Sequence, residues 1–281
     1  MAQILFIGDL HTKTFLLPLI DKVIKRHKPD HIICMGDYMD DWDASSTENY
    51  ESAQKIFAWA RRHGNVTLLF GNHDMSYYSG TCDCSGNDID ILDKVRSFFA
   101  ENLGMLKVAE SSGNWLFTHA GLTRDWAHKY IGIPESAAEA AQLLNDLLDT
   151  PEGQAKLQTV GKGRWGYDKP GPLWADWSEL NGDLYPGINQ IVGHTPQRTC
   201  LENVSGKGER LWCCDTFSAY RSGERYGDGS MLLLDTEAIG SPDWPISKGS
   251  VTIIEQPNDT AFRAGYRKKR QRKPGLTSQR P

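Results

Sequence analysis

The sequence predicts an α/β fold, and three observations carry this prediction. Over the first 75 residues, short continuous apolar runs alternate with segments whose apolar residues recur at helical spacing. The second half returns to short apolar runs in close succession. The 281 residues are 39% hydrophobic and 24% charged, the balance of an ordinary globular protein. Together these features predict one domain with a parallel sheet covered on both faces and a second, antiparallel or mixed sheet.

The first 75 residues repeat a strand–helix pattern. Strands are predicted over residues 3–8, 31–36 and 65–71, and helices over residues 14–27 and 48–62. Each strand ends in a polar cluster, namely GDLH, GDYMDD and GNHD. Because open α/β sheets place their sites beyond the carboxyl ends of the strands, the three clusters should meet in space.

The rest of the chain is more varied. Helices are predicted over residues 88–101 and 135–148, with a strand at 114–121 between them and an irregular Gly-, Pro- and Trp-rich loop over 161–187. Four short strands follow at 188–194, 210–216, 230–236 and 250–256, and their close spacing predicts the second sheet. The domain is expected to span residues 1–257, and residues 258–281 to form a basic, disordered tail.

Charge and cysteine content restrict the functional classes. The net charge of −5 combines +8 in residues 262–281 with −13 in the remainder, so the body does not resemble a general nucleic-acid binder, although the tail could contact nucleic acid. There is no apolar run long enough to span a membrane and no basic leader, which predicts a cytoplasmic protein without membrane attachment. The six cysteines are then expected to be free thiols.

Metal-competent side chains end five of the predicted strands. They are two aspartates, one asparagine and three histidines: Asp9, His11, Asp37, Asn72, His119 and His194. Taken singly, each has an ordinary explanation as a turn or loop residue. Their joint occurrence at strand ends predicts a metal site, and a mixed set of oxygen and nitrogen donors suits Mn, Fe or Zn better than Ca or Mg.

The order of these motifs resembles that of the calcineurin-like metallophosphoesterases. Within that group the chain is most similar to the bacterial and phage branch of the phosphoprotein phosphatase family. The resemblance rests on Gly8-Asp9-Leu10-His11, Gly36-Asp37, Gly71-Asn72-His73-Asp74, His119-Ala120-Gly121, Leu173-Trp174-Ala175-Asp176, Gly193-His194-Thr195-Pro196 and Asp215-Thr216. These motifs span residues 8–216, which is most of the chain.

The resemblance implies a sandwich of two mixed β-sheets flanked by α-helices, with a dinuclear site at one edge. Asp9 and His11 would bind the first cation, Asp37 would bridge both, and Asn72, His119 and His194 would complete the second. Two divalent ions, Mn²⁺ in the first instance, would bind a bridging hydroxide as the nucleophile. His73 would serve as the general acid, oriented by a hydrogen bond that its ring donates to the neighbouring Asp74.

The second motif departs from the family pattern GDxVDRG. Asp41 stands where a phosphate-binding arginine is usual, which weakens the case for phosphoproteins as substrates unless this acid is paired or turned away. Arg164, and after it Arg124, are the candidates to replace that arginine, with Arg198 as a further option. Four tryptophans, at positions 42, 165, 174 and 177, are interpreted as packing residues, with a stacking wall for an aromatic group as the alternative.

The sequence therefore predicts a metal-dependent phosphoesterase, preferentially a phosphomonoesterase acting on phospho-Ser/Thr or on a small phosphate ester. One alternative is a nucleotide or nucleic-acid phosphodiesterase or a dinucleoside polyphosphate hydrolase. The other is a catalytically inactive binding module, which the intact ligand set argues against. The sequence leaves the oligomeric state open.

Overall fold

Two mixed β-sheets form the centre of the molecule. The computed structural model describes residues 3–42, 44–80, 84–236 and 250–254; the basic tail and Cys82 lie outside these ranges. The first sheet has the order β11-β10-β1-β2-β3-β4 and the second the order β5-β6-β7-β9-β8. The strands of the first sheet are Gln3–Ile7 (β1), His31–Cys34 (β2), Val66–Leu69 (β3), Leu106–Lys107 (β4), Met231–Asp235 (β10) and Ser250–Ile254 (β11). Those of the second are Ala109–Ser112 (β5), Trp115–Thr118 (β6), Asn189–Val192 (β7), Leu201–Val204 (β8) and Arg210–Cys213 (β9).

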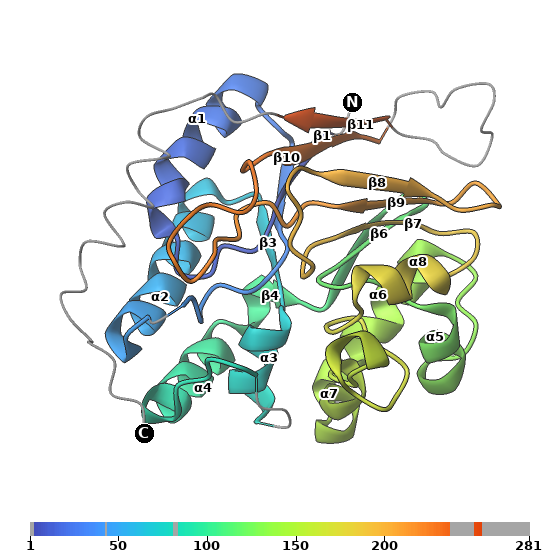
Figure 1. Ribbon diagram of the computed structural model, residues 1–281, viewed down its shortest axis with the longest axis horizontal. Helices are drawn as coiled ribbons and strands as arrows, with labels where there is room; N and C mark the ends of the chain where they lie inside the picture. Colours follow the sequence, from blue (N-terminus) through green and yellow to red (C-terminus); the bar gives the residue numbers. More distant parts are fainter. Residues whose placement is uncertain (1–2, 43, 81–83, 237–249, 255–281) are drawn as a thin grey trace.

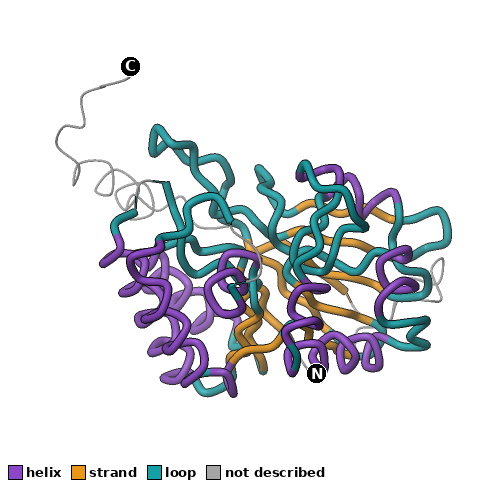
Figure 2. Tube along the Cα trace, turned by 90° about the horizontal axis from the view of Figure 1, so that it is seen from below, coloured by secondary structure: helices purple, strands orange, loops and turns teal. Residues whose placement is uncertain are grey.

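Helices cover the outer faces of both sheets (Figures 1 and 2). The α-helices are Leu17–His27 (α1), Ser46–His63 (α2), Asn72–Ser79 (α3), Leu92–Glu101 (α4), Arg124–Tyr130 (α5), Ala137–Asp146 (α6), Pro151–Leu157 (α7) and Trp177–Gly182 (α8). Short 3-10 turns occur at Thr14–Leu16, Ile89–Ile91, Leu103–Met105, Leu147–Asp149 and Lys162–Arg164. Helix α2 shows how local sequence sets the boundaries. Ser45 and Glu48 form a capping box at its start, and Gly64 ends it in the left-handed conformation.

The side chains of β1 alternate between the two faces of the first sheet, and this explains how the layers pack. Leu5 and Ile7 face the helices α1 and α2, whereas Ile4 and Phe6 face the second sheet. Phe6 meets Phe117 of β6 edge to face, with ring centroids 4.7 Å apart, in a fully buried apolar layer between the sheets. On the far side of the second sheet, Leu180 of α8 packs on its outer face. The predicted fold, two mixed sheets packed face to face and flanked by helices, is confirmed.

Two expectations need correction. The strands at 230–236 and 250–256 do not belong to the second sheet; β10 and β11 pair antiparallel on the outer side of β1, with Leu5 opposite Leu233. Both faces of β10 are buried, which suits a position inside a sheet rather than a free edge. The loop over 161–187 is not wholly irregular, since it contains α8 and a 3-10 turn. The described residues include no helix that is long and apolar enough to span a membrane, and the described cysteines are all free.

Candidate metal centre

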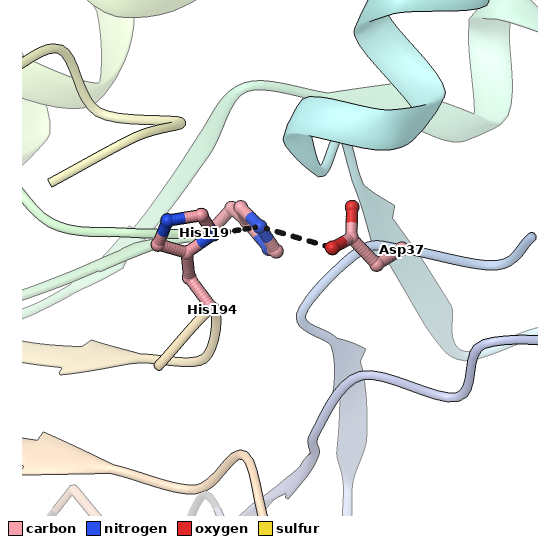
Figure 3. Close-up of side chains that lie close together, drawn as sticks. All are labelled: Asp37, His119 and His194. Atoms are coloured by element: carbon pink, nitrogen blue, oxygen red, sulfur yellow. Dashed lines mark hydrogen bonds and ion pairs between the residues drawn. The ribbon is translucent and has the colours of Figure 1, made fainter. Parts of the chain in front are cut away.

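The six predicted metal ligands converge where the strands of both sheets end. Asp9 and His11 follow β1, Asp37 follows β2, and Asn72 begins α3 just after β3. His119 follows β6 and His194 follows β7, so the second sheet supplies the remaining two side chains. Figure 3 shows Asp37, His119 and His194 pointing toward one another from three separate loops. All six are buried except His11, which is partly exposed.

The donor atoms form two overlapping groups. Asp37, His119 and His194 make one group, and Asp9, His11 and Asp37 the other, with the donor atoms of each group within 4.8 Å of one another. The Asn72 Oδ1 atom lies 2.9 Å from His119 Nε2 and 3.0 Å from His194 Nδ1. The Asp37 Oδ2 atom lies 3.5 Å from both His11 Nε2 and His119 Nε2. Asp37 is therefore common to both groups, in the position that a bridging carboxylate requires.

Backbone carbonyls fix the tautomers of two of these histidines. His11 Nδ1 lies 2.8 Å from the Met39 carbonyl oxygen, and His119 Nδ1 lies 2.7 Å from that of Met35. Each Nδ1 must donate its hydrogen there, so each Nε2 presents a lone pair toward Asp37. Burial lowers the pKa of His119 and lowers that of His11 to about 4, which keeps both rings neutral. The Nε2 lone pairs of these rings and the Asp37 carboxylate face one another with no hydrogen between them, which is the arrangement that binds a cation.

The buried carboxylates fit a cation as well. Burial and the nearby acids Asp215 and Asp37 raise the pKa of Asp9. Its Oδ2 atom accepts the His194 backbone N–H at 3.0 Å, while its buried Oδ1 atom has no hydrogen-bond partner among the described residues. A buried carboxylate oxygen without a donor is costly, and a divalent cation would relieve that cost. The residues present therefore suit the metal pair that the family resemblance implies.

Backbone strain is concentrated at this site. Non-glycine residues with left-handed φ include His11, Thr12, Asp37, Asp40 and His194, which account for five of the seven such residues described. Conformations of this kind cost of order 1–3 kcal/mol each and persist where the surrounding structure imposes them. Four of these five residues, His11, Asp37, Asp40 and His194, line the cavity described below.

Two motif glycines allow the loops to approach one another. Gly36 has φ +108°, and a Cβ atom there would lie 2.9 Å from His119 Nδ1 and would collide with the backbone of Gly71. A Cβ atom on Gly71 would in turn collide with the carboxylate and backbone nitrogen of Asp37. The glycines therefore set the spacing between the loops after β2 and β3.

His73 has a different partner from the one predicted. Its Nδ1 atom lies 3.0 Å from Asp40 Oδ2, and the Tyr77 hydroxyl donates to the other oxygen of Asp40 at 2.8 Å. Burial opposes protonation of His73, but the charge of Asp37 and the hydrogen bond with Asp40 outweigh it and raise the pKa of His73 to about 9. The imidazole is thus held in its protonated form beside the metal ligands.

Asp74 does not orient His73, and that prediction is wrong. Its carboxylate accepts backbone N–H groups from Asp37 at 2.7 Å, Tyr38 at 3.0 Å and Gly71 at 3.0 Å. Adjacent residues at the start of a helix point in different directions, so Asp74 faces the backbone of two loops while His73 faces the cavity. Asp74 holds the metal-binding loops together and acts on His73 only through its charge.

The unexpected acid at position 41 is paired. Its Oδ2 atom lies 3.4 Å from Lys13 Nζ, and both side chains are almost fully buried. The Lys13 ammonium also lies 3.5 Å from the His11 carbonyl oxygen. Lys13 thus places a positive charge near the predicted metal ligands, a feature that was not predicted from the sequence. Its position two residues after His11 was an available signal.

A cavity of about 740 Å³ opens above these residues. Its lining includes the ligands His11, Asp37, Asn72 and His194, together with His73, Lys13 and Asp215. Burial raises the pKa of Asp215 to about 7, although Lys13 and the Ser218 hydroxyl partly offset this. Arg164 also lines the cavity, where its guanidinium lies 3.2 Å from both Asp176 Oδ2 and Thr195 Oγ1.

The other arginine candidates lie elsewhere. Arg124 is half exposed and paired with Asp125 and Asp183, at 3.1 and 2.9 Å, and it does not belong to the described lining of the cavity. Its prediction as a substrate-binding residue is therefore not supported. Arg198 packs over the Tyr226 ring, 5.1 Å from its centroid.

Of the tryptophans, Trp174 and Trp177 pack against apolar clusters as expected, whereas Trp42 and Trp165 are exposed at the cavity.

Two overlapping groups of side chains that could hold metal ions lie at the strand ends of a four-layer α/β fold and define a candidate metal-dependent hydrolase site. Residues 2–198 match the family model for calcineurin-like phosphoesterases. The chain belongs to this family and is a metal-dependent phosphoesterase.

The fold is also similar to solved structures. One is the cold-active protein-tyrosine phosphatase of a psychrophilic Shewanella species, with 18% identity, coverage of 83% of this chain and 75% of that chain, and a TM-score of 0.53. A second structure of a cold-active protein-tyrosine phosphatase gives 17% identity, coverage of 84% and 75%, and a TM-score of 0.54. No curated protein gives a significant match to this sequence. These similarities concern the fold.

Proposed function

We propose that the protein is a phosphomonoesterase of the Ser/Thr protein phosphatase type, similar to the bacterial and phage branch, that acts with two divalent cations. The observation that carries the proposal is the convergence of carboxylate, amide and imidazole donors from both sheets around Asp37, at the floor of an open cavity. Mixed carboxylate, amide and imidazole donors favour Mn²⁺, with Fe or Zn as alternatives that metal analysis distinguishes.

The metal ligands divide as Asp9 and His11 on one side, Asn72, His119 and His194 on the other, and Asp37 between them. When bound, two such cations neutralise phosphate charge and lower the pKa of a water molecule between them. The protein contributes fixed directions for the donors. The carbonyls of Met35 and Met39 hold the rings of His119 and His11, so these rings need little reorganisation when a cation binds.

His73 is the proposed general acid. It lines the cavity and carries a proton that Asp40 and the local negative charge stabilise. The oxygen of the departing alcohol needs a proton as its bond to phosphorus breaks, and a protonated imidazole at the cavity wall can supply it.

Arg164 and Lys13 are the proposed phosphate-binding residues. Both line the cavity, and both are cations held in place by an acid, Asp176 for Arg164 and Asp41 for Lys13. A monoester carries one more negative charge than a diester and exposes three terminal oxygens, so two cationic side chains beside a metal pair favour the monoester.

The test compares p-nitrophenyl phosphate with bis-p-nitrophenyl phosphate as substrates of manganese-loaded protein. We expect the monoester to give the higher kcat/KM. Dominant turnover of the diester would replace this proposal with the phosphodiesterase alternative, and the lack of turnover of both, with full metal content, would favour a binding module.

The acid role is tested with His73→Asn. General-acid catalysis contributes about 10²–10⁴-fold, so kcat should fall by that order while the metal content stays the same. The matched control is His128→Asn, an exposed histidine on α5 outside the cavity, which should leave kcat unchanged. Loss of metal from the His73 variant would show that the residue is a ligand and not the acid.

A further inference from the structure

Aromatic side chains surround the mouth of the cavity. We call Trp42, Trp165, Tyr220 and Tyr226 the aromatic rim; all four line the cavity whose floor carries the metal ligands. Trp42 is 57% exposed, Trp165 90% and Tyr220 46%. Large aromatic surfaces in water are unfavourable, and their grouping at the entrance of one cavity marks a binding surface.

Contacts hold three of the four rim side chains, Trp42, Tyr220 and Tyr226, in place. The Trp42 indole N–H donates to the Ala219 carbonyl at 2.9 Å, which fixes the ring against a segment that lies far away in the sequence. In that segment, Ala219 and Arg225 form a β-bridge, and the rings of Tyr220 and Tyr226 meet edge to face at 5.5 Å. Exposed rings that are held in one orientation lose little conformational freedom when a ligand binds.

The backbone of Trp165 has an uncommon conformation. It adopts φ +61°, an uncommon conformation for a bulky residue, at the end of the 3-10 turn that carries Arg164. Strain of this kind is typical of ligand-binding segments. The turn therefore presents an arginine and an indole to the same cavity.

The size of the cavity leaves space for a leaving group. Cavities of about 300–1,000 Å³ hold complete small-molecule ligands, and a phosphate group alone would leave most of the 740 Å³ unfilled. Planar rings stack favourably on indole and phenol rings, whereas aliphatic groups gain only the apolar contact. The chemistry of the rim thus matches a flat π-system attached to the phosphate.

We propose that the aromatic rim is a subsite for the leaving group and that the preferred substrates are phosphate esters whose leaving group contains a planar aromatic ring. This inference rests on the proposed function, in which the phosphate group lies at the metal ligands, and it narrows the preferred monoesters from aliphatic phospho-Ser/Thr to esters with a ring in the leaving group. An aryl ring and a nucleobase share this chemistry, and the experiment below separates them.

The experiment measures dissociation constants by calorimetry on the manganese-loaded full-length chain. Non-hydrolysable phosphonates are used, because phenyl and alkyl esters differ in leaving-group reactivity. Phenylphosphonate is compared with cyclohexylphosphonate, which has a similar size but no π-face. We expect phenylphosphonate to bind roughly fivefold more tightly, the usual contribution of aromatic pairing beyond contact area. A second pair, the phosphonate analogues of AMP and of ribose 5-phosphate, tests the nucleobase. The pair with the larger ratio identifies the source of the ring.

Variants of the rim locate the effect. Trp42→Leu and Tyr220→Leu should bring the phenyl-to-cyclohexyl ratio close to one, and Trp42→Phe should retain most of it. The matched control is Tyr167→Leu, because Tyr167 is fully exposed, lies two residues from Trp165 and does not belong to the described lining. Melting curves establish that each variant is folded, and if one leucine variant does not fold, the other carries the test.

Equal binding within both ligand pairs overturns the inference, and so does a ring preference that survives both leucine substitutions. The outcomes also separate the two proposals. Rim-dependent ring preference without hydrolysis of any monoester would remove the proposed function and leave the subsite. Efficient monoester hydrolysis without ring preference would support the proposed function and remove the subsite.

Discussion

At the scale of single residues, the roles of neighbouring acids depend on which backbone groups they meet. Asp40 and Asp74 are both buried, and only Asp74 was predicted from the sequence as the partner of His73. Only the structure separates them: Asp40 bonds the imidazole, and Asp74 accepts three backbone N–H groups. Asp74 is adjacent to His73 in the chain, and this adjacency led to the wrong assignment.

Asp40→Asn tests the new assignment. The amide cannot stabilise the protonated imidazole as a carboxylate does, so kcat should fall, by at most the 10²–10⁴-fold that general-acid catalysis contributes. KM and metal content should change little, because Asp40 is not one of the metal ligands. Asp93→Asn, an exposed acid on α4, is the control. Unchanged kcat in the Asp40 variant would contradict the positioning role.

Lys13→Met tests the buried cation. Hydrogen bonds to charged groups contribute about 1.5–3 kcal/mol, which predicts a rise in KM for a phosphate monoester of roughly tenfold to a hundredfold. The single variant removes the cation that faces the buried Asp41 carboxylate and should also lose stability. The double variant Lys13→Met/Asp41→Asn separates the effects. Its melting temperature should recover while its KM stays high, and a normal KM would exclude Lys13 from phosphate binding.

At the scale of elements, the sequence predicted the strands best where they alternate with helices or end in a metal-binding motif. The strands and helices of the first 75 residues, and the strands that carry His119 and His194, were predicted close to their observed positions. The edge strand β4 has two residues and β8 is largely exposed, so neither produces a continuous apolar run. Sheet membership of β10 and β11 depends on pairing with β1 at the other end of the chain, which local sequence does not encode.

Gly36→Ala tests the close contact between the loops after β2 and β3. The added methyl group would meet the backbone of Gly71 and the ring of His119, so the variant should lose both stability and metal. Backbone conformation alone accounts for about 1–3 kcal/mol of the loss. Gly64→Ala is a close control, because Gly64 also has positive φ but nothing within 4 Å of an added Cβ atom. That variant should lose stability and keep its metal, and full metal content in Gly36→Ala would refute the packing argument.

At the scale of the whole molecule, the metal centre joins the two sheets. Four of its ligands follow strands of the first sheet and two follow strands of the second. The set could be predicted from sequence because each member ends an apolar run. The pairing of Asp40 with His73, that of Lys13 with Asp41 and the contact of Trp42 with Ala219 could not, because they arise from contacts between loops.

Metal removal should therefore weaken the whole fold. A ligand present at 100 times its dissociation constant stabilises the folded state by about 2.7 kcal/mol, so manganese should raise the melting temperature and chelation should lower it. Differential scanning calorimetry with and without manganese measures the shift. In Asp37→Asn, which alters the residue common to both ligand groups, the shift should be small or absent. An equal shift in that variant would place the stabilising ion elsewhere.

The central position of β1 has a consequence for biosynthesis. This strand lies between β2, which follows it closely, and β10, which is among the last elements of the chain to be synthesised. During synthesis on the ribosome, the backbone N–H and C=O groups on one edge of β1 therefore stay unpaired until residues 231–235 emerge. Until then the nascent chain presents an incomplete sheet, and a stalled ribosome would leave that edge available to chaperones or to aggregation.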